Sequence, residues 1–266
     1  MTKRLSSVLG GLKVPNFFVL IPARYDSARL PGKALLDIAG KPMVVRVAER
    51  AKLSGATQVM VATDDQRILQ AVNDHGFAAC MTKTEHVSGT DRIAEVATQQ
   101  GWADDAIVVN VQGDEPLIVP DLIARVAAKL NDDGAAVMAT ACYAITSLAD
   151  FQNPNVVKVV LDDLGHAMYF SRSPIPYNRN AASDAAKNFV SAYRHVGIYA
   201  YRVKFLKQFA SLPAASLERM EGLEQLRALQ QGCKIAVYVS DQAPVNGVDS
   251  MEDLDVVRAR FQSHVS

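Results

Sequence analysis

Short continuous runs of apolar residues recur along this chain and alternate with stretches of helical periodicity. The first run, Phe17 to Ile21, ends at Pro22 and shows no polar alternation, which predicts a strand buried on both faces. Similar runs lie at Gln58–Ala62, Ala106–Val111, Val137–Tyr143 and Ile235–Val239. Segments with helical spacing of apolar residues separate most of them, as at Met43–Leu53 and Leu122–Leu130. The pattern predicts an α/β fold whose mostly parallel sheet is flanked by helices.

The rhythm changes between Val156 and Tyr201, where shorter β-like pieces replace the alternation of strands and helices. These pieces are Val156–Leu161, Ala167–Phe170 and Val196–Tyr201, with a loop rich in Pro and Asn over Ser173–Asn180. We interpret the region as an inserted subdomain of about residues 151–215, within one domain of residues 17–266. Residues 1–16 are expected to form a flexible tail, because their apolar stretch is interrupted and no signal-peptide cleavage site follows.

One helix is predicted over Ser216–Gln231. Gly232 supplies its stop signal. Its apolar side consists of Leu217, Met220, Leu223, Leu226 and Leu229. Glu224 and Gln225 lie on the polar side of this helix, which is solvated by default.

Composition narrows the classes of function. The 266 residues suffice for one domain with a large core, and 49% of them are apolar. The 28 basic side chains balance the 28 acidic ones, so no overall field attracts nucleic acid or anionic lipid, and a small-molecule partner is expected. No uncharged apolar run approaches the ~20 residues that cross a bilayer. Three scattered cysteines predict reduced thiols in the cytoplasm.

A cationic loop follows the first predicted strand. Residues 22–33 contain Arg24, Arg29 and Lys33 together with a Pro-Gly turn. Ligands of an open parallel sheet bind beyond the carboxyl ends of its strands, and fixed cations with backbone N–H groups hold phosphates well. The loop is neither a Walker motif nor a dinucleotide fingerprint, because it lacks their spaced glycines. Composition alone fits an ordinary surface loop equally well, but the position after a buried strand favours a triphosphate site.

Carboxylates stand at two further loop ends. Asp114 follows the run that ends at Val111, and Asp249 precedes the last predicted helix. Asp249, with Glu252 three residues later, is also typical of a helix-capping pair, and Asp114 fits a simple turn. Magnesium prefers one or two carboxylates plus substrate phosphates. A magnesium site beside the phosphate loop is therefore a hypothesis, which requires that the two aspartates meet.

Seven segments, taken in order along the chain, form a recognisable set. They are Ile21–Lys33, Ser88–Arg92, Asn110–Pro116, Asn153–Lys158, Tyr169–Arg172, Arg194–Tyr199 and Leu223–Arg227. With these segments the chain resembles the 3-deoxy-manno-octulosonate cytidylyltransferases, the CMP-Kdo synthetases, from Phe18 to about Arg258. The resemblance implies a Rossmann-like nucleotidyltransferase fold with a smaller inserted subdomain for dimerisation and sugar binding. It also implies a homodimer that transfers CMP from CTP to Kdo, giving CMP-Kdo and pyrophosphate for lipopolysaccharide biosynthesis.

The resemblance implies the following site residues. The triphosphate is held by Ala23, Arg24 and Lys33. The nucleoside lies near Ser88, Gly89, Arg92 and Gln112. The metal Mg²⁺ is bound by Asp114 and Asp249, and these two with Lys33 and Arg24 are the expected catalytic residues. The sugar pocket is lined by Arg172, His195, Tyr199, Glu224 and Gln225. Arg172 is the expected partner of the sugar carboxylate, because its planar fork binds a carboxylate at two points.

Several of these residues also have a purely structural interpretation. His195 precedes an apolar run and fits a hydrogen-bonded core histidine. Ser88 or Thr90 fits the cap of a helix. Without the resemblance, the structural interpretation is the better one for His195 and for the polar pair Glu224 and Gln225.

Three other functions stay open at this stage. The same reaction on 8-amino-Kdo differs by one sugar substituent, which the sequence does not resolve. A CMP-sialate synthetase shares the expected fold, but the sugar-pocket segments argue against it. A non-catalytic nucleotide-sugar sensor keeps the fold without turnover, and the presence of Lys33, Asp114 and Asp249 argues against that function.

Overall fold

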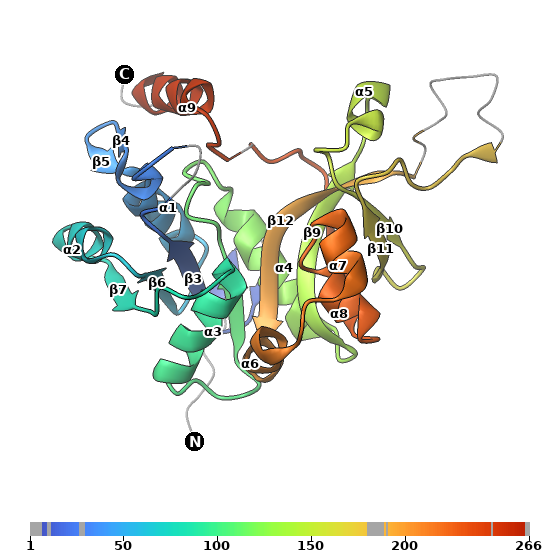
Figure 1. Ribbon diagram of the computed structural model, residues 1–266, viewed down its shortest axis with the longest axis horizontal. Helices are drawn as coiled ribbons and strands as arrows, with labels where there is room; N and C mark the ends of the chain where they lie inside the picture. Colours follow the sequence, from blue (N-terminus) through green and yellow to red (C-terminus); the bar gives the residue numbers. More distant parts are fainter. Residues whose placement is uncertain are drawn as a thin grey trace.

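The computed structural model describes residues 7–9, 12–26, 30–179, 189, 191–245 and 247–263. Within these ranges a nine-stranded sheet forms the centre of the molecule (Figure 1). Seven strands follow the order β11-β10-β12-β8-β3-β6-β7, and β9 pairs with both β12 and β13. The bounds are β3 Phe17–Ala23, β6 Gln58–Thr63, β7 Ala78–Met81, β8 Ile107–Asn110, β9 Ala136–Ala144, β10 Lys158–Leu161, β11 Ala167–Ser171, β12 Tyr193–Arg202 and β13 Lys234–Ser240.

The strands β8, β3, β6 and β7 are mutually parallel, as are β9 and β13. The long strand β12 is antiparallel to β8, β9 and β10 and joins the two halves of the sheet. The predicted fold class, a mostly parallel sheet flanked by helices, is therefore confirmed. Because β3, β6 and β8 run side by side in one direction, their carboxyl ends open toward the same edge of the sheet.

Helices cover both faces of this sheet. One face packs against α1, α2 and α4, and the other against α3, α6 and α8. The helices are α1 Met43–Lys52, α2 Gln66–Asp74, α3 Gly89–Gln99, α4 Pro120–Asp132, α5 Leu148–Gln152, α6 Val203–Ser211, α7 Ser216–Glu221, α8 Leu226–Gln230 and α9 Met251–Ser263. None of the helices in the described part of the chain is long and apolar enough to cross a membrane.

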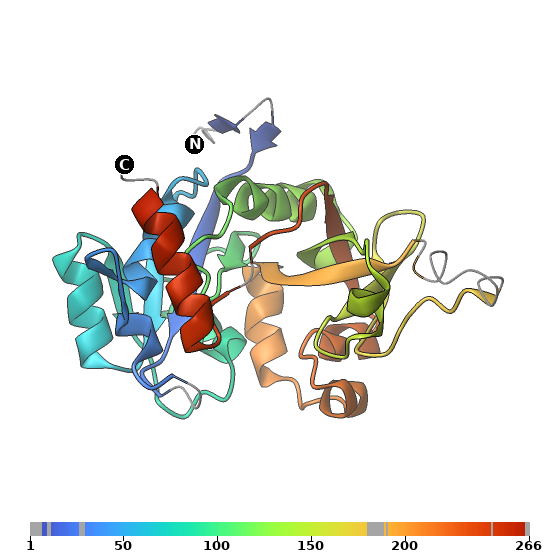
Figure 2. The same cartoon turned by 90° about the horizontal axis from the view of Figure 1, so that it is seen from above.

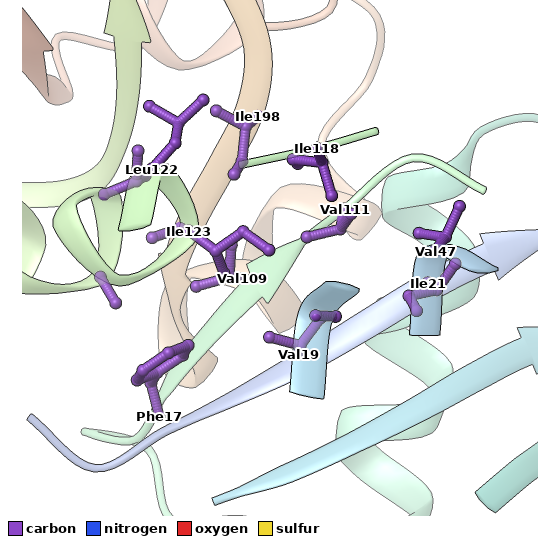
Figure 3. Packing of buried hydrophobic residues seen from close by; sticks show 14 of the residues in the cluster. Phe17, Val19, Ile21, Val47, Val109, Val111, Ile118, Leu122, Ile123 and Ile198 are labelled. Atoms are coloured by element: carbon purple, nitrogen blue, oxygen red, sulfur yellow. The ribbon is translucent and has the colours of Figure 1, made fainter. Parts of the chain in front are cut away.

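Strand β3 is apolar throughout because both of its faces are buried in the core. Phe17, Val19 and Ile21 pack into the core beneath α1 and α4 (Figure 3), whereas Leu20 points to the opposite core. Side chains alternate between the two faces along a strand, so a strand covered on both faces needs apolar residues at every position.

The region expected to be an inserted subdomain continues the central sheet. Strands β10 and β11 pair with each other, and β10 adds to the sheet through β12. Strand β12 in turn pairs with β8 through residues 199–202. A small apolar cluster of Ile145, Phe151, Val156 and Ala192 supports the outer end around α5. Residues 151–215 thus share their sheet with the rest of the domain.

Part of the expected N-terminal tail has regular structure. Strand β1 (Ser7–Leu9) pairs with β2 (Leu12–Val14) in an antiparallel hairpin, and Val14 is fully buried in the core. Structure therefore begins before residue 17. Two further short strands, β4 (Asp37–Ile38) and β5 (Lys41–Pro42), pair just before α1.

The single helix predicted over residues 216–231 is wrong. The chain forms α7 and α8 instead, because Gly222 adopts a left-handed conformation (φ 62°, ψ 41°) that ends α7. Glycine adopts this conformation without the steric cost that a Cβ imposes. The break brings Glu224 and Gln225 into the turn between the helices, where Gln225 is only 4% exposed.

Candidate active site

A pocket of about 280 Å³ opens at the carboxyl ends of β3 and β8, beside the N-terminus of α3. It is lined by Pro22, Ala23, Arg24, Lys33, Ala34, His86, Val87, Ser88, Gly89, Arg92, Gln112, Gly113 and Asp114. Every described residue that we expected to contact the triphosphate or the nucleoside therefore lies around one cavity. Three loop residues at positions 27–29, including Arg29, lie outside the described residues.

Gly113 lets the two walls of the pocket approach each other. A Cβ at this position would lie 2.8 Å from the backbone oxygen of Pro22 and 3.5 Å from the Cβ of Ala23. Contacts under 3.0 Å require a shift of the backbone, since neither wall ends in a flexible side chain here. The close approach of β3 and the loop after β8 thus depends on glycine.

We expect Gly113→Ala to weaken nucleotide binding and to destabilise the fold by about 1–3 kcal/mol, as overpacking of a tight contact does. Nucleotide titration and urea unfolding measure the two effects. Gly134→Ala is the matched control, because a Cβ there would meet no atom within 4 Å. Equal nucleotide affinity in both variants would contradict the role given to this contact.

Lys33 joins the two predicted metal ligands. Its Nζ lies 2.6 Å from Oδ2 of Asp114 and 3.3 Å from Oδ1 of Asp249. The Lys33 side chain is 13% exposed, whereas those of Asp114 and Asp249 are 35% and 54% exposed. Lys33 begins a short 3₁₀ helix after Gly32, whose left-handed backbone (φ 68°) turns the loop into the pocket. The ammonium group therefore lies between two carboxylates that are 135 residues apart in sequence.

A backbone contact brings Asp249 to this place. The N–H of Val248 donates a hydrogen bond of 2.8 Å to the carbonyl of Asp114, and the Val248 side chain is fully buried. Figure 2 shows the red segment that leads from β13 across the molecule to α9 and carries this contact. The segment between β13 and α9 thus completes the site.

The helix cap expected at Asp249 is formed by another residue. Ser250 and Asp253 cap α9 reciprocally: Asp253 N donates to Ser250 Oγ at 3.2 Å, and Ser250 N donates to Asp253 Oδ2 at 2.9 Å. This is the capping-box geometry, one residue later than predicted. The carboxylate of Asp249 instead faces Lys33, and Asp253 rather than Glu252 completes the capping pair with Ser250.

The carboxylates fit magnesium as the ion that they would share. Asp114 and Asp249 contact one cationic group, so both are within reach of a common cation. Across the described ranges no cluster of three or more His, Cys, Asp or Glu could hold a metal ion. Magnesium is commonly bound by one or two carboxylates, with waters and substrate phosphates completing its shell. The donor set therefore fits an ion that arrives with a nucleotide triphosphate.

The N-terminus of α3 forms another wall of the pocket. Ser88 caps the helix by accepting a hydrogen bond of 3.1 Å from Asp91 N, so it has the structural role considered above while lining the cavity. Arg92 is 3% exposed, and its Nη2 lies 2.6 Å from Oδ2 of Asp64. The positive charge of Arg92 is thus balanced inside the protein. Arg92 shapes the wall, and Arg24 and Lys33 are the other lysine and arginine side chains among the described residues that line the pocket.

Thr90 connects this wall to the residues expected to bind the sugar. Its Oγ1 donates a hydrogen bond of 2.9 Å to Oε2 of Glu224, from the turn between α7 and α8. Burial raises the pKa of Glu224, although hydrogen bonds from Thr90 and Ser88 act in the opposite direction. The N-terminal turn of α3 therefore lines the pocket through Ser88 and contacts Glu224, one of the residues expected to bind the sugar, through Thr90.

His195 and Tyr199 lie on the same face of β12. Their rings are 5.5 Å apart, and the ring of Phe170 lies 5.0 Å from that of His195. His195 Nε2 is 2.9 Å from Thr140 Oγ1. Burial lowers the pKa of His195 to about 3, so the ring is neutral at physiological pH. The ring is hydrogen-bonded as a core histidine would be, but His195 is half-buried and lines a small second pocket, so a neutral ring there is also able to hydrogen-bond a sugar hydroxyl.

Arg172 is anchored next to the turn between α7 and α8. Its Nε donates 2.7 Å to the carbonyl of Glu221, and its Nη1 donates 3.1 Å to that of Pro154. These bonds orient the guanidinium group but occupy part of the fork that was expected to bind the sugar carboxylate. The remaining donors on the terminal nitrogens are the ones that a carboxylate would use.

Sequence reasoning gave no role to three groups at this site or next to it in the chain. His86 lines the pocket, and its Nε2 lies 2.5 Å from Oε2 of Glu95. The signal available in the sequence was its position two residues before the Ser88 cap. Glu115 follows Asp114, and burial and the neighbouring Asp114 charge raise its pKa to about 8. Asn110, the last residue of β8, is 1% exposed. Its signal was a polar residue within an apolar strand.

Comparison with known proteins agrees with this geometry. A family model described as cytidylyltransferase matches residues 18–235. The chain is 45% identical to CMP:2-keto-3-deoxy-manno-octonic acid synthetase, whose solved structure is a complex with CTP, with a TM-score of 0.85 over 94% of this chain and 99% of that chain. A cytidylyltransferase from Leptospira borgpetersenii serovar Hardjo-bovis shares the fold at 18% identity and a TM-score of 0.61, covering 93% and 87% of the two chains. The chain therefore belongs to the cytidylyltransferase family.

Proposed function

We propose that this protein transfers CMP from CTP to 3-deoxy-manno-octulosonate, Kdo, and releases pyrophosphate. The observation that carries the proposal is the contact of Lys33 with both Asp114 and Asp249 at the edge of the nucleotide pocket. The 45% identity to a CMP-Kdo synthetase over nearly the whole of both chains supports the same substrates. The enzyme is a nucleotidyltransferase that supplies activated Kdo for lipopolysaccharide biosynthesis.

The chemistry is a direct displacement at the α-phosphorus of CTP. The anomeric hydroxyl of Kdo forms a new P–O bond and loses its proton, while the bond from the α-phosphorus to the oxygen that bridges to the β-phosphate breaks. Negative charge develops on the departing pyrophosphate. Lys33 and Arg24, which line the pocket, would stabilise this charge, and one such contact is worth roughly two to three decades in rate.

Asp114 and Asp249 would hold the magnesium ion. A bound magnesium ion acidifies the attacking hydroxyl and neutralises phosphate charge. The protein contributes the two carboxylates, and Lys33 keeps them in one place by pairing with both. The resemblance further implies a homodimer, which sedimentation analysis of the purified protein tests.

Pyrophosphate release from a panel of substrates tests the proposed function. The enzyme is incubated with magnesium, one of the four common nucleoside triphosphates, and Kdo, 8-amino-Kdo or N-acetylneuraminate. We expect release with CTP and Kdo above every other combination. Preference for 8-amino-Kdo would show that the proposed sugar substrate is wrong, and preference for another nucleotide would show that the proposed base is wrong. No release from any pair, with CTP binding intact, would favour a nucleotide-sugar sensor.

A further inference from the structure

Three buried polar atoms in the described residues have no hydrogen-bond partner. They are Oδ1 of Asn110, Oε1 of Glu224 and Nε2 of Gln225. Each of these atoms is buried, and Asn110 and Gln225 as whole residues are only 1% and 4% exposed. A buried polar group without a partner costs stability, and native proteins contain few of them. Their presence here requires an explanation.

The three residues lie on the same side of the sheet, because Leu223 and Leu226, which flank Glu224 and Gln225, pack in the apolar cluster that includes Tyr199. Asn110 pairs with Tyr199 across β8 and β12, and residues opposite each other in an antiparallel pair point to the same face. The Glu224 carboxylate is close enough to Tyr199 to contribute to raising the pKa of that phenol, after the larger effect of burial. Gln225 follows Glu224 in the turn before α8. Asn110 therefore faces the group of residues expected to contact the sugar.

Other buried polar side chains in the described part of the chain have partners. Ser54 donates to the carbonyl of Ala51 at 2.6 Å, and Thr140 donates to that of Ile198 at 2.8 Å. The buried ammonium of Lys158 contacts three carbonyls. Hydrogen bonding is thus complete at these positions. The unpartnered atoms belong instead to Asn110, two residues before the pocket residue Gln112, and to the turn whose Glu224 accepts a hydrogen bond from Thr90 of α3.

We propose that Asn110 is a sugar-binding residue that determines specificity together with Glu224 and Gln225. The inference rests on the proposed function and extends it to a residue with no role assigned so far. A carboxylate oxygen accepts hydrogen bonds, and a carboxamide both donates and accepts them. Neighbouring hydroxyl groups of a sugar also do both. The chemical class that satisfies all three side chains at once is a polyhydroxylated chain such as that of an acidic octulose.

Asn110→Leu tests the proposal, because leucine has nearly the shape of asparagine and no polar atom. We expect the variant to be as stable as the wild type or more so, since a buried polar group without a partner is removed. The KM for Kdo should rise about tenfold, as for one lost hydrogen bond of ~1.4 kcal/mol, while the KM for CTP stays within about twofold. Gln225→Met, also close in shape, should behave in the same way.

Ser54→Ala is the matched control, because it removes a buried hydroxyl that has its partner. It should lower the melting temperature and leave both KM values unchanged. Asn110→Leu that loses stability like the control, with an unchanged KM for Kdo, would overturn the proposal in favour of a structural role. If Asn110→Leu does not fold, Gln225→Met and Asn110→Ser decide by the same comparison of KM with stability.

Calorimetric titration with Kdo separates this inference from the proposed function. If the wild type binds Kdo without releasing pyrophosphate and Asn110→Leu binds it about tenfold more weakly, the reaction is wrong and the sugar site stands. Another outcome is that turnover is normal while the wild type still binds every singly deoxygenated Kdo analogue more tightly than Asn110→Leu does. In that case no sugar hydroxyl bonds to Asn110, and the proposed hydrogen bond is wrong. If the wild type neither binds nor turns over Kdo, both proposals fail.

Discussion

Asp114→Asn is expected to lower kcat/KM by about two to three decades, the usual size of one lost electrostatic contact in the transition state. The substitution keeps the shape of the side chain and removes its charge, so a divalent cation and Lys33 both lose a charged partner. The fold should be retained, because Asp114 is partly exposed and its backbone carbonyl still accepts from Val248. Initial rates of pyrophosphate release over a range of CTP concentrations, at saturating Kdo and with magnesium varied, give the measurement.

Asp104→Asn provides the control for charge removal alone. Asp104 is 67% exposed and pairs with Lys207 at 3.4 Å, outside the residues that line the pocket, so its loss should leave turnover unchanged. Asp249→Asn should resemble Asp114→Asn, and the double variant should cost less than the product of the two, because both carboxylates serve one ion. Near-normal turnover and an unchanged magnesium requirement in Asp114→Asn would refute the metal assignment.

The sequence predicted the centre of the fold because burial on both faces leaves a clear signal. Phe17–Ile21 is apolar at every position, and it became β3 at the centre of the parallel strands. Strand β7 gave no comparable signal, since its residues Ala78–Met81 lie at the edge of the sheet and are partly exposed. The cationic loop followed from its position after a buried strand, which topology alone places at the ligand-binding edge.

The α7–α8 pair was missed because periodicity alone favours a continuous helix. Five leucine and methionine residues at helical spacing continue past Gly222, and a glycine inside a helical pattern is often tolerated. Only the tertiary structure shows that Gly222 is left-handed. This break places Glu224 against α3 and buries Gln225, so their interior position depends on one backbone conformation that the pattern does not specify.

Asp249 shows how two local signals compete. Ser250 and Asp249 are both good capping residues, and capping rules alone do not say which of two neighbours begins the helix. The hydrogen bond from Val248 to Asp114 settles it, because it fixes the chain so that Asp249 points to Lys33 and Ser250 caps α9. A contact between residues more than 130 positions apart decides this local choice, and the sequence pattern carries no record of it.

Lys158→Met is expected to destabilise the protein by about 2–4 kcal/mol, the largest effect on folding that we predict. Lys158 is fully buried in β10, and its Nζ donates to the carbonyls of Asn153, Val156 and Arg172 at 3.0, 2.6 and 2.5 Å. Burial lowers the pKa of this ammonium. Methionine fills the same space but leaves three carbonyls without this donor. The variant also avoids the cost of burying an ammonium group, but this gain is smaller than the loss of three hydrogen bonds.

Urea unfolding of Lys158→Met and of Lys207→Met measures this difference. Lys207 is only partly buried, with 35% of its side chain exposed, and its pairing with Asp104 is long, so its substitution should change stability by less than about 0.5 kcal/mol. The Arg172 carbonyl is one of the acceptors of Lys158, and Arg172 is expected to bind the sugar. Lys158→Met should therefore also raise the KM for Kdo more than that for CTP. Equal midpoints in the two variants would mean that backbone relaxation or water replaces the ammonium at all three carbonyls.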